Sequence, residues 1–320
     1  MKHTKTILLA GAAGFLGSHL VKKFLSHNFK VICLDDLSSG KLENLNEFSS
    51  DLNFEFIKHD VTFPFIYEKS IDFILNFACP ASPVQYQINP VKTIETNFIG
   101  MSNLLKLAKD RQIPILQAST SEVYGDPAIS PQKETYWGNV NPIGVRSCYD
   151  EGKRAAETLC FDYMRQFNLD VRVIRIFNTY GPNMSINDGR VVSNFIVQAL
   201  RNSDITVYGN GNQTRSFCYV SDLVDGIYKI VLVPGTLDYP INLGNPYELT
   251  VKSLAEKIIL LTNSSSSIIH VELPSDDPQK RKPDIGKALK LIGWNPQVDI
   301  DEGLLKTIEY FKNVLVKKSG

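Results

Sequence analysis

Short, continuous apolar runs along the first half of the chain are typical of strands buried on both faces. They occupy residues 6–10, 30–34, 53–58, 71–77 and 114–118. Between them, residues 15–27 and 91–110 carry apolar side chains at the three- and four-residue spacing of a helix that covers a sheet. Because this alternation is typical of parallel sheets, it predicts an α/β protein with a Rossmann-type doubly wound parallel sheet.

The rhythm changes after a proline- and glycine-rich segment at residues 125–144. A helix at residues 147–167 and a strand at 171–177 are predicted to follow it. Shorter elements then come between Gly and Asn residues, with helices expected at residues 191–202, 222–233, 250–262, 284–291 and 302–316.

We place a domain boundary near residue 180, where the pattern changes. Residues 1–180 are expected to form the domain with the large sheet. Residues 181–320 are expected to form a smaller C-terminal α/β domain that binds substrate. A return of residues 215–245 to the first domain stays open as an alternative.

The composition, 43% hydrophobic and 21% charged, is that of an ordinary folded protein. The 34 Lys and Arg residues balance 34 Asp and Glu, so nothing favours a nucleic-acid partner or a basic membrane-docking surface. No apolar run is long enough to span a membrane or serve as a signal peptide, so we expect a cytoplasmic protein. The five cysteines form no CxxC pair and the five histidines lack metal-ligand spacing, which predicts reduced thiols and no metal site.

Glycines at three-residue spacing follow the first predicted strand directly: Gly11, Gly14 and Gly17. A strand, a glycine turn and a helix N-terminus let the backbone approach a pyrophosphate. The second strand ends at Asp35, whose carboxylate suits a ribose diol and repels a 2′-phosphate, so the predicted cofactor is NAD. The alternative is a packing turn beside a solvated aspartate. The predicted cofactor site also includes Phe15, Leu16, Asp60, Val61 and Ala78.

A YxxxK motif, Tyr149 to Lys153, falls on the helix predicted at residues 147–167. Side chains four residues apart share one helix face, and a nearby ammonium lowers the pKa of a phenol. Tyr149 is therefore the expected base, with Lys153 in the cofactor site beside it. Thr120, at the end of a predicted strand, is expected to place its hydroxyl beside Tyr149; capping of a turn is the alternative for Thr120.

The glycine spacing and the YxxxK motif together resemble the extended short-chain dehydrogenase/reductase superfamily. From Lys5 to about Tyr310 the chain resembles one of its families, the UDP-glucuronate decarboxylases that form UDP-xylose. The stretches that carry this resemblance are CPASP at 79–83, YWGNVNP at 136–142, RSCY at 146–149, RIFNTYGP at 175–182, DGRVVSNF at 188–195 and DDPQKRKPD at 276–284.

The pair Ser121-Glu122 is the most informative part of this resemblance. Nucleotide-sugar 4,6-dehydratases carry Asp-Glu there, and 4-epimerases usually lack the glutamate. Asp36, where the family commonly has Asn, and Ser38-Ser39, where it has Phe-Thr, depart from the pattern near the adenosine.

The resemblance implies NAD-dependent decarboxylation of UDP-glucuronate to UDP-xylose and CO2 through a UDP-4-keto-hexuronic acid, with NAD recycled. Glu122 and Arg281 are implied as a further catalytic pair, although a capping carboxylate and a solvated cation are their alternatives. Expected substrate contacts are Asn178, Arg190, Asn194, Tyr208, Arg215 and Arg281.

Other readings of the chain stay open. It can be a 4-epimerase or 4,6-dehydratase on the same scaffold, or a non-catalytic NAD-binding partner protein. The resemblance also implies a homodimer built on the helices at residues 91–110 and 147–167.

Overall fold

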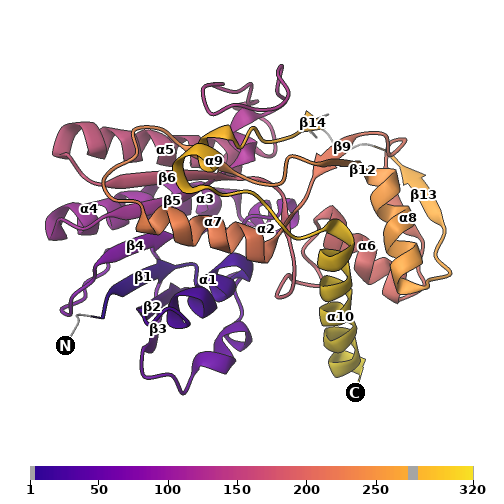
Figure 1. The fold of residues 1–320 in the computed structure, drawn as a ribbon, viewed down its shortest axis with the longest axis horizontal. Coiled ribbons are helices and arrows are strands. Elements are labelled where there is room, and N and C mark those ends of the chain that lie inside the picture. The colour runs from indigo at the N-terminus through magenta and orange to yellow at the C-terminus, as the bar shows by residue number, and fades with distance from the viewer. Residues whose placement is uncertain (1–3, 273–279, 320) are drawn as a thin grey trace.

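The computed structural model describes residues 4–272 and 280–319, and one parallel sheet of seven strands dominates it (Figure 1). The strand order is β11-β6-β5-β4-β1-β2-β3. The strands are β1 (Thr6–Ala10), β2 (Lys30–Asp35), β3 (Phe54–Lys58), β4 (Phe73–Asn76), β5 (Ile115–Thr120), β6 (Val171–Ile176) and β11 (Ile241–Leu243). The chain therefore winds outward in both directions from β1, which confirms the predicted doubly wound Rossmann-type sheet.

Helices cover both faces of this sheet (Figure 1). On one face, α4 (Met101–Arg111) and α5 (Ser147–Phe167) pack through side chains such as Leu105 and Cys160. On the other face, α1 (Phe15–Leu25) and α7 (Val220–Leu232) pack through residues such as Phe24 and Ile227. The strands are buried on both sides for this reason, which explains their unbroken apolar runs.

The helix predicted at residues 91–110 is a continuous helical stretch with an irregular turn. It consists of α3 (Pro90–Glu95), the π-helical turn η2 (Thr96–Gly100) and α4. Three short elements in the first half of the chain were not predicted: α2 (Pro83–Tyr86) and the 3-10 turns η1 (Leu42–Phe48) and η3 (Ser121–Tyr124). Two of these depend on local caps, because Ser82 accepts from the Gln85 amide and Thr120 from the Glu122 amide. An element that depends on such a contact has no periodic pattern of hydrophobic residues, so the sequence does not predict it.

The second half of the chain forms a smaller lobe beside the carboxyl ends of the strands (Figure 1). Its helices are α6 (Val191–Leu200), α8 (Val251–Thr262) and α10 (Ile300–Ser319), whereas α9 (Gly286–Ile292) packs against β11 and α7 of the large sheet. Its strands are β7 (Thr179–Tyr180) with β10 (Cys218–Tyr219), β8 (Ile205–Tyr208) with β13 (Ile268–Val271), and β9 (Thr214–Ser216) with β12 (Glu248–Thr250) and β14 (Lys280–Arg281). Since β11 joins the large sheet, the chain returns to that sheet after residue 181. The division into domains at residue 180 stays a prediction.

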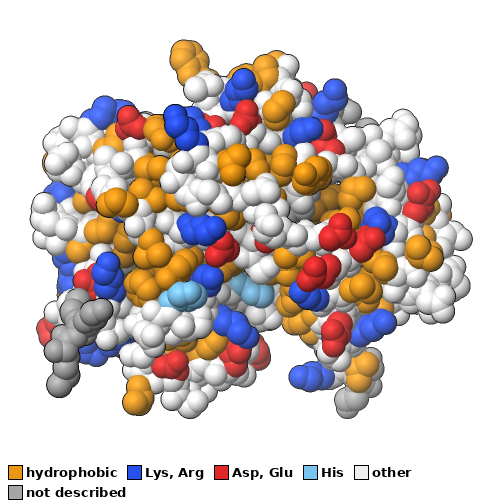
Figure 2. Space-filling view, viewed as in Figure 1, with side chains coloured by type: hydrophobic (Ala, Val, Ile, Leu, Met, Phe, Trp, Pro, Cys, Tyr) orange, Lys and Arg blue, Asp and Glu red, His pale blue; other side chains and the backbone are white. Residues whose placement is uncertain are grey.

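Basic and acidic side chains are interspersed over the face of the molecule in Figure 2. No helix within residues 4–272 and 280–319 is long and apolar enough to cross a membrane. All five cysteines are free, and the described part of the chain holds no cluster of metal-ligating side chains.

Candidate active site

A cavity of about 750 Å3 opens between the large sheet and the smaller lobe. A second, smaller cavity adjoins it, and both are lined by Gly11, Gly14, Phe77 and Cys79. The larger cavity brings together the predicted residues Gly11, Gly14, Phe15, Leu16, Gly17, Thr120, Glu122, Tyr149, Lys153, Asn178, Arg190, Asn194, Tyr208, Arg215 and Arg281. The smaller cavity brings together Asp35, Asp60, Val61 and Ala78.

The glycine loop forms a wall of this cavity between β1 and α1. Gly11 has a φ of +79°, and a Cβ atom there would lie 2.5 Å from the Phe77 carbonyl carbon. A Cβ atom on Gly17 would lie 2.1 Å from the Gly11 carbonyl oxygen. The loop therefore needs glycine for its own close packing, and it leaves the N-terminus of α1 open to an anionic group.

Asp35 lies where the second cavity meets the end of β2. Its carboxylate accepts hydrogen bonds from the backbone amides of Ala13 and Leu37, each at 2.9 Å. Burial raises the pKa of Asp35, and these two hydrogen bonds oppose that shift. Asp60 lies in the same cavity in an ion pair with Lys92. A glycine cradle that leads to a carboxylate at the end of the next strand fits a dinucleotide.

Tyr149 and Lys153 lie on one face of α5, as the motif predicted. The ammonium of Lys153 lies 5.7 Å from the centre of the Tyr149 ring and donates to the Ala118 carbonyl at 2.9 Å. Thr120 lines the same cavity as Tyr149, and its hydroxyl lies close enough to oppose the rise of the Tyr149 pKa. The structure therefore brings Tyr149, Lys153 and Thr120 together in one cavity, as the sequence predicted.

The expected lowering of the Tyr149 pKa by Lys153 is wrong for this structure. Burial raises the pKa of Tyr149 well above its usual value, and the thiol of Cys79 adds to the shift. Burial also lowers the pKa of Lys153. Both shifts follow from the removal of water, which disfavours the charged form of each group.

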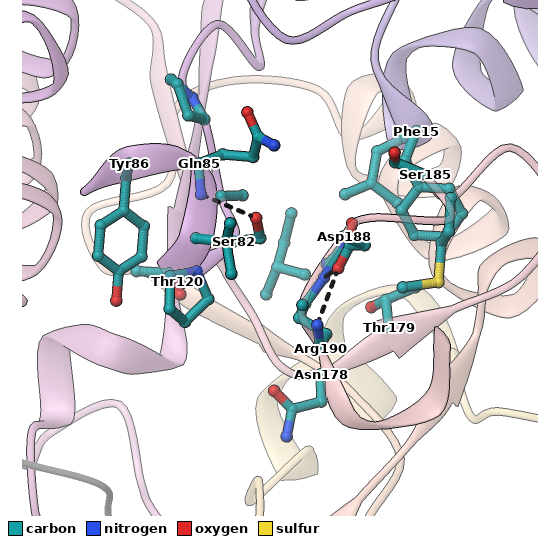
Figure 3. A pocket seen from close by; sticks show the side chains of 18 of the residues that line it. Phe15, Ser82, Gln85, Tyr86, Thr120, Asn178, Thr179, Ser185, Asp188 and Arg190 are labelled. Atoms are coloured by element: carbon teal, nitrogen blue, oxygen red, sulfur yellow. Dashed lines mark hydrogen bonds and ion pairs between the residues drawn. The ribbon is translucent and has the colours of Figure 1, made fainter. Parts of the chain in front are cut away.

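Tyr86, on α2, is a cavity residue that the sequence did not reveal. Its ring stacks on Tyr149 with centroids 4.9 Å apart and an angle of 4° between the planes. Figure 3 shows Tyr86 and Thr120 on one side of the cavity and Phe15 on the other. The stack fixes the plane of the Tyr149 ring, which keeps its hydroxyl directed at one point. A tyrosine in a one-turn helix carries no sequence pattern that would predict such a role.

Glu122 lies between two arginines at the cavity wall. Its carboxylate accepts from the guanidinium of Arg146 and from that of Arg281. Burial alone would raise the pKa of Glu122, but the charges of Arg281 and Arg146 outweigh it and lower the pKa to about 2. Arg281 is 3% exposed, which removes the alternative of a solvated cation. Glu122 is an ion-pair partner, and the backbone amide at this turn is capped by Thr120 instead.

Arg146 was not predicted as a site residue, although it stands in a stretch that carries the resemblance. Arg281 reaches the cluster from β14, about 160 residues further along the chain, and also donates to the hydroxyl of Ser121 at 3.1 Å. The residues before it, 276–279, lie outside the described part of the chain.

The expected substrate contacts follow the rest of the cavity wall. Arg190 forms a two-point ion pair with Asp188, at 2.5 and 2.7 Å, and its guanidinium lies 5.7 Å from the centre of the Phe15 ring (Figure 3). Arg190 therefore joins the smaller lobe to the glycine loop. Arg215 is paired in strand register with Arg281, so the two neighbouring strands bring their cations to the same cavity.

Three further expected contacts line the same cavity. Tyr208 is 46% exposed, so it is not a core residue. Asn194 donates to the Gly189 carbonyl at 3.1 Å. Asn178 lines the cavity, and its expected contact with substrate stays a prediction.

Residues 7–244 match the NAD dependent epimerase/dehydratase family, and the chain belongs to that family. A dTDP-glucose 4,6-dehydratase from Bacillus anthracis, solved in complex with NAD, has the same fold. Its TM-score is 0.86 and its sequence identity 26%, over 97% of each chain.

Closer sequence relatives narrow the class. UDP-glucuronic acid decarboxylase 3 of Arabidopsis thaliana is 56% identical over 96% of this chain and 89% of its own length. UDP-glucuronic acid decarboxylase 1 of Xenopus tropicalis is 52% identical over 98% of this chain and 74% of its own length. Within its family, the chain is one of the UDP-glucuronic acid decarboxylases.

Proposed function

We propose that this chain converts UDP-glucuronate into UDP-xylose and CO2 through a UDP-4-keto-hexuronic acid. The observation that carries this assignment is Glu122 held between Arg146 and Arg281 beside Tyr149, with Ser121 where a dehydratase has its acid. The sequence relatives support the same reaction.

The cofactor proposed for the glycine loop is NAD, which supplies a hydride acceptor and a positive charge near the sugar when it is bound. Tyr149 takes the proton of the C4 hydroxyl, and Lys153 holds positive charge behind the ring. Thr120 hydrogen-bonds the same oxygen. The positive charge of the bound cofactor would oppose the effect of burial on the pKa of Tyr149.

Oxidation at C4 turns the sugar into a β-keto acid, because the carboxylate is attached to the neighbouring carbon C5. CO2 then leaves, and its bonding electrons pass into the C4 carbonyl as an enolate. Tyr149, now protonated, and Thr120 donate hydrogen bonds to the enolate oxygen. Water supplies the proton that is added at C5. Hydride returns to C4, and Tyr149 returns its proton to the C4 oxygen, so the reaction has no net redox change.

The ion pairs of Glu122 matter for the release of CO2. A free arginine would hold the substrate carboxylate tightly and raise the barrier to its loss. In this cavity Glu122 already accepts from both Arg146 and Arg281. Glu122 therefore cancels part of the charge of the two cations and weakens their hold on the substrate carboxylate.

Incubation of the purified protein with UDP-glucuronate and catalytic NAD tests this proposal. We expect release of CO2 and formation of UDP-xylose, followed by mass spectrometry. A deuterium label at C4 should be transferred to the nicotinamide ring and then back to C4 of the product. Formation of UDP-galacturonate without CO2 would favour a 4-epimerase, and NAD binding without turnover would favour a non-catalytic protein.

We also propose a homodimer. The side chains of Val91, Ile94, Phe98 and Ile99, on α3 and η2, are 40% to 65% exposed in the single chain. Apolar side chains exposed together on one helical stretch favour an interface with a second copy. Light scattering of the purified protein should give twice the chain mass of 35.9 kDa. The cytoplasmic location expected from the sequence stays a prediction, which cell fractionation tests.

A further inference from the structure

Asp150 is a buried carboxyl group that the proposed mechanism does not use. It is 7% exposed, follows Tyr149 on α5 and does not line the cavity. Its Oδ2 atom lies 3.9 Å from Nε of Arg146. Among the residues that the structure describes, no group donates a hydrogen bond to its Oδ1 atom. A buried carboxylate with so little support is costly to keep ionised.

Glu122 and Asp150 differ sharply in this support. Both compete for Arg146, but Glu122 also accepts from Arg281. Arg146 and Arg281 thus carry two positive charges against two carboxyl groups. If a further anion enters this enclosed cluster, three negative charges face two positive charges. The carboxyl group with the fewest hydrogen bonds and ion pairs, Asp150, is then the one that gains a proton.

The substrate brings such an anion. The C4 hydroxyl must lie at Tyr149, and the carboxylate on the neighbouring C5 then falls near the wall that Glu122, Arg146 and Arg281 form. This placement rests on the proposed function. UDP-xylose has no carboxylate, so the product does not bring the extra charge.

We propose that Asp150 is a positioning residue that takes up a proton from solvent when UDP-glucuronate binds, so that the sugar carboxylate can lie beside Glu122 and Arg146. On binding, one O–H bond forms on Asp150. Once CO2 has left and C5 has gained its proton, the cluster has lost one negative charge. Asp150 then ionises again and releases its proton to solvent.

The surroundings of Asp150 agree with this cycle. Burial and then the charge of Glu122 raise the pKa of Asp150 to about 7, against the opposing charges of Arg146 and Arg281. Other titratable groups that face it are Glu151, Cys148, Tyr149 and Tyr86. Among these neighbours only the two arginines favour the ionised form, so an added carboxylate shifts Asp150 toward its protonated form.

Proton uptake on binding is the first test. The Tyr149→Phe variant, loaded with NAD, should bind UDP-glucuronate without turnover. Calorimetry at pH 8 in two buffers of different ionisation enthalpy should show uptake of about 0.5 to 1 proton per site. UDP-xylose should show none, and Asp150→Asn in the same background should abolish the uptake. Equal uptake with and without Asp150, or none with UDP-glucuronate, overturns the proposal.

The pH dependence of turnover is the second test. The Asp150→Asn variant mimics the protonated form, so its kcat/KM should fall less at alkaline pH than that of the wild type. The ratio of variant to wild type should rise at least about fivefold between pH 6 and pH 8.5. A purely structural role would leave this ratio constant with pH. The control Asp162→Asn, which changes an exposed acid on the same helix, should leave the profile unchanged.

These tests separate the two proposals. If the wild type forms no CO2 from UDP-glucuronate, the proposed function fails. If CO2 forms but the ratio and the proton uptake do not respond to Asp150, only the role of Asp150 fails.

Discussion

The glycine loop and the Glu122 cluster line the same cavity, but the chain builds them in different ways. The loop is seven consecutive residues, Gly11 to Gly17, whose backbone packs against itself and against Phe77. The cluster joins Glu122, Arg146 and Arg281, which come from η3, the segment before α5 and β14. The glycine loop depends on the close packing of its backbone, whereas the Glu122 cluster depends on the compensation of buried charges.

This difference separates how the two regions respond to change. A backbone cradle fails through steric overlap, so a single methyl group is enough to disturb it. A buried ion cluster fails when one partner is removed, because the remaining charges lose their compensation. Substitutions in the loop should therefore act on cofactor affinity and stability, and substitutions in the cluster should act on turnover.

The largest effect is expected at Tyr149, which lies between the two regions. Tyr149→Phe keeps the ring stack on Tyr86 but removes the hydroxyl to which the proposed mechanism transfers the C4 proton. We expect kcat for CO2 release to fall at least about a thousandfold, with NAD and UDP-glucuronate still bound. Tyr163→Phe, on the same helix, should retain full activity. Undiminished turnover in Tyr149→Phe would exclude the proposed base.

Glu122→Gln tests whether a change in the Glu122 cluster acts on turnover and not on NAD affinity. The amide leaves Arg146 and Arg281 with excess positive charge, which holds the substrate carboxylate in its ground state. We expect kcat to fall about a hundredfold while KM stays level or decreases. Glu151→Gln, a partly exposed acid paired with Arg154, is the control. If Glu122→Gln lowered NAD affinity as much as kcat, the glycine loop and the Glu122 cluster would not have the separate roles expected here.

Gly17→Ala should affect the other region. Its added Cβ atom would meet the Gly11 carbonyl at 2.1 Å and the Ala12 backbone at 2.7 Å. We expect the free energy of unfolding to fall by about 2 to 3 kcal/mol and NAD affinity to fall at least about tenfold. At Gly14 the nearest atom would lie at 3.4 Å, so Gly14→Ala should change stability little. Chemical denaturation and NAD titration measure both effects.

Asp35→Asn should have a smaller effect, on the cofactor alone. The amide keeps the shape of the side chain but loses the charge that is proposed to accept from a ribose diol and to repel a 2′-phosphate. We expect NAD affinity to fall about tenfold and the preference for NAD over NADP to narrow, with kcat at saturating NAD little changed. Asp51→Asn is the control, because this exposed carboxylate lines neither cavity and accepts from the Asn53 amide at 2.8 Å. Equal affinity of the wild type for NAD and NADP would refute the role of Asp35.

The smallest effect is expected in stability against pH. The pKa of Asp150 is raised to about 7, so the folded protein binds this proton more tightly than the unfolded chain does. The resulting stability is complete below pH 4 and is lost as the pH rises through about 7. Between pH 5 and 8 the wild type should therefore lose on the order of 1 to 2 kcal/mol that Asp150→Asn retains. Identical pH curves for the two proteins would show that the Asp150 carboxyl has an ordinary pKa.

The sequence alone determined the sheet, its main helices and the cofactor end of the cavity. Strands buried on both faces leave continuous apolar runs, and a helix such as α5 leaves a period of 3.6 residues. The glycine loop and the YxxxK motif were also readable, because each function depends on residues close together in the chain. Short elements such as α2 escaped, since one turn held by a local cap has no period.

Only the tertiary structure decided the charge balance at the other end of the cavity. Glu122 and Arg281 were implied by resemblance, but Arg146 as a partner, the stack of Tyr86 on Tyr149 and the burial of Asp150 depend on contacts between distant segments. The pKa of Tyr149 likewise depends on burial, which raises it. Electrostatic energies depend on distance and on the exclusion of water, and a sequence fixes neither until the chain has folded.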